Sequence, residues 1–338
     1  MTDTTNGTPN GSLNDSTDAT GPTNGAAAHD AAPDATPDPT SDRPTLGDPR
    51  PLAVVTGAAS GIGRGLAISL AADGFRVAMA DRNAAGLEEA KRAARRAAVA
   101  GGHRAAGPGG HPVVDATALD IADFDEVKGW ADAVVAKHGA PTDVYNAAGI
   151  SVWGDPTTLP HAKWRGVIDI NLMGTIHIVE AFTPAMADAG RGRLVCVSSA
   201  AGILGLPWHG AYSASKAGVL GLCEVLRFDL APKGISVHAV APGAVDTPLV
   251  RTIDIHGIDR GAPRVAKATK LFQGHAISPA KAAAIIRYEV DAGTYLIATS
   301  HDVHLGRWAQ VNMPWAYRGV MKALNKGLRW AADGAETK

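Results

Sequence analysis

The chain has 338 residues, and 46% of them are hydrophobic, which is enough for a sizeable buried core in one large or two modest domains. A formal net charge of -1 gives no general electrostatic reason to expect a nucleic-acid partner. Cys196 and Cys223 form no CxxC pair, so we expect buried, reduced thiols and a cytoplasmic location. We find no secretory signal pattern and no apolar stretch long enough to span a bilayer, which predicts a soluble protein.

Residues 1–50 are built mainly from Thr, Asn, Gly, Pro, Ala and Asp, and Leu13 and Leu46 are almost the only large apolar side chains among them. Ordering this segment would bury too little apolar surface to offset the lost backbone entropy. The composition predicts a disordered acidic tail, with a solubilising arm or a docking segment as functional alternatives to a plain linker.

From Pro51 the sequence alternates between short apolar runs and helical patterns. Strands are expected at 52–56, 75–81, 115–120, 143–147, 193–199, 236–241 and 294–299, and an Ala- and Arg-rich helix at 84–100. This alternation is typical of parallel βαβ units with right-handed crossovers. The predicted fold is therefore α/β, a doubly wound Rossmann sheet of about seven strands in a single domain over residues 51–300. The glycine-rich stretch 101–110 is expected to be a lengthened loop.

A glycine-rich turn follows the first predicted strand, with the sequence Thr-Gly-Ala-Ala-Ser-Gly-Ile-Gly over residues 56–63. Its position between a strand and a helix lets backbone N–H groups at the helix start receive a pyrophosphate. The alternative is an ordinary tight strand-to-helix turn. Asp81 ends the second predicted strand, where a carboxylate can accept hydrogen bonds from an adenosine ribose and would repel a 2′-phosphate. NAD is favoured as the cofactor, although the adjacent Arg82 keeps NADP open.

Tyr212 and Lys216 lie four residues apart at the start of a helix expected to run to about residue 231. That spacing puts them on one helical face, one turn apart. A phenol is a weak base at neutral pH, but a neighbouring ammonium favours the phenolate and would lower its pKa. Taken alone, the pair could equally be a surface Tyr and Lys.

Two further polar positions accompany this pair. Ser198 and Ser199 follow an apolar strand and are expected at the carboxyl edge of the sheet, where ligands bind in open α/β folds. Asn171 lies in an apolar helical run, either as a buried amide satisfied locally or as part of a proton path.

Together these features resemble the short-chain dehydrogenase/reductase family, over about residues 51–300. The motifs that carry the resemblance are TGxxxGxG at Gly57–Gly63, Asp120-Ile121, Asn146-Ala-Ala-Gly149, Asn171, Ser199, YxxxK at Tyr212 and Lys216, and Pro242-Gly243. One departure is Ala147, where family members often carry a second Asn.

The resemblance implies a catalytic tetrad. Ser199 would hold the substrate oxygen and Tyr212 would transfer its proton, while Lys216 would tune Tyr212 and hold the nicotinamide ribose. Asn171 would help to hold a water relay. The implied cofactor contacts are Gly57, Ser60, Gly61, Ile62, Gly63, Asp81, Arg82, Asp120, Ile121, Asn146, Ala147, Tyr212, Lys216, Pro242, Gly243, Val245 and Thr247.

The loops after the strands are expected to bind the substrate, through Trp153, Ser199, Leu206 and Trp208. These apolar side chains predict an apolar alcohol or ketone, although each aromatic could also be plain packing, as we expect for Trp164. His301 and His304 are expected in a solvated turn, and no metal site is predicted.

Residues 301–338 form a C-terminal extension in which Tyr317, Met321, Leu324 and Leu328 recur at helical spacing. A basic stripe of Arg318, Lys322 and Lys326 adjoins them. An amphipathic basic helix of this kind fits peripheral contact with an anionic membrane, packing on its own core, or packing on a partner subunit.

The sequence therefore predicts an oxidoreductase that moves a hydride between NAD(H) and a secondary alcohol or ketone, with Tyr212 as general acid and base. The expected partners are this small-molecule substrate and further copies of the chain in a homo-oligomer. One alternative is a non-catalytic dinucleotide sensor or scaffold on the same fold, and another is lyase or epimerase chemistry.

Overall fold

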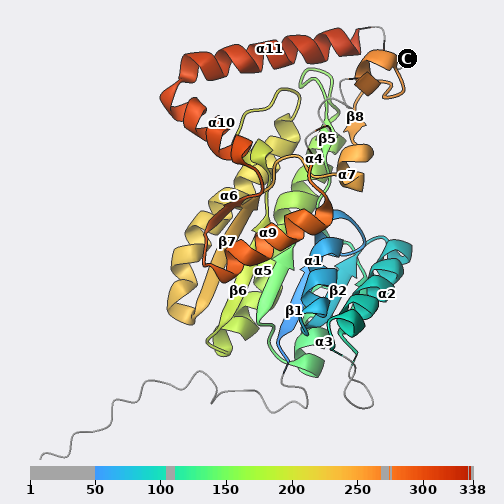
Figure 1. The fold of residues 1–338 in the computed structure, drawn as a ribbon. Coiled ribbons are helices and arrows are strands. Elements are labelled where there is room, and N and C mark those ends of the chain that lie inside the picture. Colours follow the sequence, from blue (N-terminus) through green and yellow to red (C-terminus); the bar gives the residue numbers. More distant parts are fainter. Residues whose placement is uncertain (1–49, 104–110, 268–273, 275, 334, 336–338) are drawn as a thin grey trace, which may run out of the picture. The chain divides into compact units, whose positions relative to one another are not determined.

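Seven parallel strands form the central sheet of the computed structural model, which describes residues 50–103, 111–267, 274, 276–333 and 335 (Figure 1). The strands are β1 (Leu52–Thr56), β2 (Arg76–Asp81), β3 (Val113–Ala118), β4 (Asp143–Asn146), β6 (Gly192–Val197), β7 (Ile235–Ala241) and β9 (Leu296–Ala298). Their order across the sheet is β3-β2-β1-β4-β6-β7-β9. This order confirms the predicted doubly wound α/β fold, and its direction reverses between β1 and β4.

Helices cover both faces of this sheet. The helices of the described residues are α1 (Gly61–Ala72), α2 (Ala84–Ala100), α3 (Phe124–His138), α4 (His161–Ile168), α5 (Gly174–Asp188), α6 (Gly210–Asp229), α7 (Pro248–Arg251), α9 (Pro279–Asp291), α10 (His301–Asn312) and α11 (Pro314–Ala332), of which α1, α2, α3, α5, α6 and α9 pack on the sheet. One core cluster joins the sheet to α3, α5 and α6, and the other joins it to α1, α2 and α9. Along β1, Val54 faces the first cluster while Ala53 and Val55 face the second, because successive strand residues point to opposite faces.

Short polar side chains begin several of these helices. Asn83 accepts a hydrogen bond from the N–H of Gly86 at the start of α2, and Asp123 accepts from two N–H groups at the start of α3. Ser278 accepts from the N–H of Lys281 at the start of α9. Each side chain satisfies a backbone donor that has no partner within its helix, which fixes where the helix starts.

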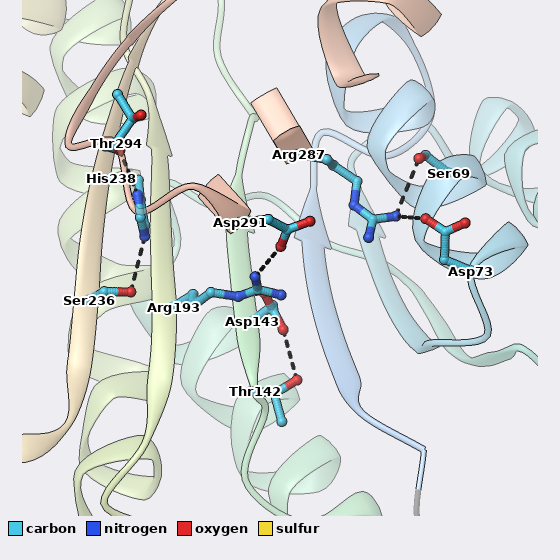
Figure 2. Close-up of polar contacts among 10 residues, drawn as sticks. All are labelled: Ser69, Asp73, Thr142, Asp143, Arg193, Ser236, His238, Arg287, Asp291 and Thr294. Carbon is cyan, nitrogen blue, oxygen red and sulfur yellow. Dashed lines mark hydrogen bonds and ion pairs between the residues drawn. The ribbon is translucent and has the colours of Figure 1, made fainter. Parts of the chain in front are cut away.

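The amino ends of the strands carry an ionic network rather than a pocket (Figure 2). Arg193 of β6 pairs with the buried Asp143 of β4 and with Asp291 of α9. Arg287, also on α9, pairs with Asp73 beyond the end of α1. The network ties α9 to the sheet and to α1, at the edge opposite to the carboxyl ends of the strands.

A small two-stranded parallel sheet lies outside the main one. It pairs β5 (Val152–Trp153) with β8 (Asp254–Ile255), and so links the loop after β4 to the loop that follows β7. The expected loop at 101–110 and the expected tail at 1–50 fall largely outside the described residues. The predicted C-terminal helix is α11, and α10 precedes it, with His301 and His304 in the first turn of α10 rather than in a turn between elements.

Candidate active site

The glycine loop lies where the strand order reverses, between β1 and α1. Gly57 and Gly61 have φ angles of 66° and 54°, a backbone region that favours glycine. A Cβ atom on Gly57 would lie 2.8 Å from the backbone of Ala147, and one on Gly63 would lie 2.3 Å from the Gly57 oxygen. The loop therefore needs glycine at these places to stay close to β4 and to start α1 here. Gly57, Ser60, Gly61 and Ile62 line one cavity, while Gly63 lies behind the loop.

Asp81 holds this loop from the end of β2. Its carboxylate accepts hydrogen bonds from the N–H groups of Ala59, at 3.0 Å, and Asn83, at 2.9 Å. Asp81 and the exposed Arg82 both line the cavity, next to the start of α1. Asp81 thus has a structural contact to the glycine loop in addition to the place expected for a ribose contact.

Asp120 and Ile121 follow β3 and line the same cavity. The Asp120 side chain is exposed and accepts a hydrogen bond from the N–H of Ala122, so it shapes its own turn. Ile121 is buried against Gly174, where a Cβ atom would lie 2.6 Å from the end of its side chain.

A chain of buried hydrogen bonds runs behind the cavity wall. Thr56 donates to the amide oxygen of Asn146, and the Asn146 amide nitrogen donates to the Thr175 hydroxyl at 2.8 Å. Thr175 in turn donates to the backbone oxygen of Asn171 at 2.7 Å. Asn146 does not line the cavity, so it supports the sheet beneath, while Ala147 forms part of the wall.

Asn171 lies in a π-helical turn, Asp169–Met173, between α4 and α5. Its amide oxygen accepts from the N–H of Ile150 at 2.8 Å, and its amide nitrogen donates to the Ile150 oxygen and to the Ser215 hydroxyl. Side-chain oxygen and nitrogen are therefore both engaged, and the residue is fully buried outside the cavity lining. Of the two expectations for Asn171, the locally satisfied amide describes this arrangement, which joins the loop after β4 to α6.

Ser199 and Tyr212 both form part of the cavity wall. Ser199 follows β6, and Tyr212 lies in the first turn of α6. Burial raises the pKa of the Tyr212 phenol, and a hydrogen bond with Ser199 opposes that rise. Ser198, the preceding residue, instead donates to the Lys216 backbone oxygen at 2.7 Å and fixes α6 against β6.

Lys216 is buried one turn after Tyr212. Its Nζ donates to the Val197 oxygen at 2.9 Å and lies 6.0 Å from the centre of the Tyr212 ring. Burial lowers the Lys216 pKa to about 8. Burial is the leading cause for both groups, and the pKa of Tyr212 is raised, not lowered as expected from the Lys216 ammonium.

These residues share one cavity of about 940 Å³, near the upper end of ordinary ligand pockets. Its wall also contains the predicted residues Pro242, Gly243, Val245, Thr247, Trp153 and Leu206. The glycine cradle and Asp81 border one part of it, and Ser199 and Tyr212 border another. The residues present therefore fit a dinucleotide together with a small substrate.

Trp208, expected at the substrate, lies outside this cavity. It lines a second hollow together with Arg329 of α11, and it has a φ angle of 65°. Trp164, expected in the core, packs on the small apolar cluster that contains Tyr212.

His209 is a cavity residue that the sequence did not single out. Its ring lies 4.0 Å from the Trp153 ring, centre to centre, and its Nδ1 lies 2.7 Å from the Pro207 oxygen. Because a carbonyl only accepts, Nδ1 carries the proton, and burial lowers the His209 pKa to about 4. The neutral ring leaves Nε2 as an acceptor. Its position three residues before Tyr212, on the adjoining turn, was the available signal.

No group of three or more His, Cys, Asp and Glu side chains suited to a metal ion occurs within the described ranges of the chain. Cys196 and Cys223 are free thiols and both are buried, in β6 and α6.

Residues 51–256, more than half of the chain, match the family model described as short chain dehydrogenase. Over 195 residues the chain is 37% identical to the 3-oxoacyl-[acyl-carrier-protein] reductase FabG of Staphylococcus aureus, covering 57% of this chain and 74% of that protein. It is also 37% identical to D-threitol dehydrogenase of Mycolicibacterium smegmatis, over 59% of this chain and 71% of that one. A solved actinorhodin polyketide ketoreductase with NADPH matches with a TM-score of 0.60 and 28% identity, over 74% of this chain and 95% of that chain. With this sequence match and the strand order of the sheet, the chain belongs to the short-chain dehydrogenase family of oxidoreductases.

Proposed function

We propose that this protein catalyses reversible hydride transfer between NAD(H) and a secondary alcohol or ketone. The observation that carries the proposal is that Ser199, Tyr212 and Lys216 line the same cavity, with Lys216 buried one turn after Tyr212 along α6. A bound nicotinamide would supply or accept the hydride.

The chain's own residues would manage the oxygen and its proton. Ser199 and Tyr212 would both donate hydrogen bonds to the substrate oxygen as negative charge develops on it, and Tyr212 would give up its proton in reduction or take one in oxidation. Lys216 would hold the nicotinamide ribose and pass the proton between Tyr212 and solvent, toward Tyr212 in reduction and away from it in oxidation. Asn171 would act as a positioning residue that fixes the loop after β4 beside the reacting centre.

NAD is the inferred cofactor, with NADP as the second choice. Asp81 at the end of β2 supports NAD, because its carboxylate would accept from ribose hydroxyls and repel a 2′-phosphate. The neighbouring Arg82 supports NADP, and so does the ketoreductase relative that was solved with NADPH. The remainder of the dinucleotide would bind to the glycine loop, Asp120, Ile121, Ala147 and the segment from Pro242 to Thr247. Gly63 and Asn146 would support this part of the site without lining the cavity.

Several apolar side chains that line the cavity support the proposal of an apolar substrate. Trp153, Leu204, Leu206 and Ile253 are among them, and His209 adds one hydrogen-bond acceptor. A substrate with an apolar body and a hydroxyl near the reacting carbon would satisfy both features. A 3-oxoacyl-[acyl-carrier-protein] reductase and a D-threitol dehydrogenase are among the relatives, which supports the reaction class without naming the substrate. We also propose that the protein forms a homo-oligomer and that it is located in the cytoplasm.

A screen of alcohols and ketones with NAD(H) and NADP(H) in parallel tests the reaction. We expect reversible change in nicotinamide absorbance with apolar secondary alcohols or ketones, faster with NAD(H). Cofactor binding without turnover across the panel would favour the sensor or scaffold alternative. Conversion of a substrate without net redox change would favour lyase or epimerase chemistry.

A further inference from the structure

Helices α10 and α11 expose an unusual number of large apolar side chains. Thirteen such side chains are exposed in the described part of the chain, and seven of them lie on these two helices. They are Leu305, Trp308, Val311, Trp315, Val320, Leu324 and Trp330. Trp315 is 71% exposed and Val311 is 69% exposed, so neither side chain is covered by the core. Isolated apolar residues on a surface are ordinary, but a run of this density marks an interaction surface.

The same two helices carry only positive formal charge between Val303 and Ala332. Five exposed cations occur there, Arg307, Arg318, Lys322, Lys326 and Arg329, with no Asp or Glu among them. Arg329 reaches Asp155 at 3.8 Å, whereas the ion pairs found within the described residues include none to the other four. The chain as a whole has a formal net charge of -1, so this positive charge is concentrated locally.

One side of α11 is held against the rest of the protein. Its residues Tyr317, Met321 and Leu328 are half-buried, and the Tyr317 hydroxyl accepts a hydrogen bond from the N–H of Gly205 at 2.8 Å. At a helical turn of about 100° per residue, Trp315, Lys322 and Lys326 fall within one sector of about 40° on the outer side. The Trp330 ring flanks this sector and is contacted by the Arg264 guanidinium, 4.8 Å from the ring centre. Figure 1 shows α10 and α11 standing clear of the central sheet. The inner face is thus occupied, and the outer face combines cations with tryptophan.

We propose that the outer surface of α10 and α11 docks on an anionic lipid bilayer. Tryptophan rings favour the level of the lipid headgroups, the exposed Leu305 and Val311 of α10 would enter the acyl boundary, and Arg and Lys would meet lipid phosphates. A second copy of the chain would bring an equally cationic surface against this one, which disfavours it as the occupant. Nucleic acid would leave Leu305 and Val311 without an apolar partner.

This surface adjoins the active-site cavity. Asp302 and Val303 of α10 line the cavity, as does Leu204, which packs on Gly306 of α10. A docked protein would therefore present part of its cavity rim near the lipid, where an apolar substrate is concentrated. This consequence rests on the proposed function, but the docking itself does not. None of the described helices is long and apolar enough to cross a membrane.

Vesicle co-sedimentation of the full chain, measured without substrate, tests the docking. We expect binding to phosphatidylcholine vesicles that contain phosphatidylglycerol, and little binding to phosphatidylcholine alone. The triple variant Arg318→Gln, Lys322→Gln, Lys326→Gln should bind the anionic vesicles about a hundredfold more weakly than the parent, because each lost cation should weaken binding about fivefold. The variant Val311→Ser, Trp315→Ser should also lose binding, and the tryptophan emission of the parent should shift to shorter wavelength with anionic vesicles only.

The matched control is Arg92→Gln, Arg96→Gln, Val99→Ser on α2, which removes exposed cations and an exposed valine elsewhere. This control should bind vesicles like the parent, and every variant should keep the parent's circular dichroism. Equal sedimentation of parent and surface variants, or none by the parent, would overturn the proposal. Loss of self-association in these variants, with unchanged vesicle binding, would assign the surface to a second copy instead.

Discussion

Single buried groups set the acid–base properties of the candidate site. Tyr212 and Lys216 both line the cavity and are buried. Burial disfavours the charged form of each, so it raises the pKa of Tyr212 and lowers the pKa of Lys216. A bound oxidised nicotinamide would bring a positive charge and favour the Tyr212 phenolate. Alcohol oxidation should accordingly rise with pH toward the Tyr212 pKa, since the base form is the one that accepts the proton.

Replacing Tyr212 by Phe removes the transferable proton and keeps the ring. Turnover should fall by about 10³-fold or more, because general acid–base catalysis is lost together with one of the two donors to the substrate oxygen. Cofactor affinity, measured by nicotinamide fluorescence, should stay within a few-fold of the parent. Retained turnover would reject the role that we assign to Tyr212.

Lys216 provides a test of burial that does not depend on activity. Its pKa is lowered from 10.5 to about 8, so the folded state binds fewer protons than the unfolded state between those values. Stability therefore rises with pH across this window, and below it the buried charge costs up to about 3 kcal/mol. The thermal stability of Lys216→Met, relative to the parent, should be greatest near neutral pH and decline toward pH 10. A pH-independent difference would contradict this account of Lys216.

Asp81 links cofactor choice to the shape of the glycine loop. Replacement by Ser removes the charge and the acceptor of the Ala59 N–H, so the ratio of kcat/KM for NAD to that for NADP should fall at least about tenfold. Asp81→Asn, which keeps an oxygen acceptor and loses the charge, should lie between parent and Asp81→Ser. An unchanged ratio in both would show that Asp81 does not set the preference.

At the scale of elements, α11 supports the substrate side of the cavity from a distance. Its Tyr317 hydroxyl accepts from Gly205, one residue from Leu204 and Leu206 in the cavity wall. The backbone oxygen of Ala335, just after α11, accepts from the N–H of Asp259 at 2.7 Å. The α11 segment and the residues after it therefore contact one loop at the cavity wall and another beside the second hollow, although no residue of α11 lines the main cavity.

Tyr317→Phe tests this support by removing one hydroxyl. We expect KM for the substrate to rise about fivefold, because one hydrogen bond to the loop at Gly205 is lost, with KM for NAD unchanged. The matched control is Tyr288→Phe, which changes a 72% exposed tyrosine on α9. Equal KM values for parent and Tyr317→Phe would show that the contact does not position the loop.

At the scale of the whole molecule, the carboxyl and amino ends of the parallel strands have different roles. The carboxyl ends of the strands border the cavity, and the amino ends hold the network of Arg193, Asp143 and Asp291 (Figure 2). Asp143 is 1% exposed, so its charge depends on Arg193 for compensation. Changes at this edge should alter stability and leave the chemistry of the site intact.

Arg193→Leu should lower the free energy of unfolding by about 3 kcal/mol, because it leaves a buried carboxylate unpaired. Adding Asp143→Leu should recover part of that loss, and kcat per folded molecule should remain that of the parent. Lys128→Leu, which breaks an exposed pair with Asp132, serves as the control and should cost under about 1 kcal/mol. A loss from Arg193→Leu no larger than that of the control would contradict the assigned role of the network.

The sequence by itself determined the fold class, the approximate positions of the seven strands of the main sheet, and the family. Strand periodicity, the glycine loop and the Tyr-Lys spacing are local features, so they can be recognised in the sequence without knowing how the chain packs. The glycine loop predicted Ser60 to Ile62 and the family resemblance implied Pro242 to Thr247, and residues of both segments line the cavity.

Only the tertiary structure decided which side chains meet. His209 enters the cavity because Trp153, far away in the sequence, stacks on it, and Trp208 turns out of the cavity with a positive φ angle beside α11. The periodicity of α11 predicted an apolar face but not what covers it, since packing depends on contacts between distant segments. Those contacts bury Tyr317 and leave Trp315 and the basic stripe exposed, which is the arrangement on which the proposed lipid docking depends.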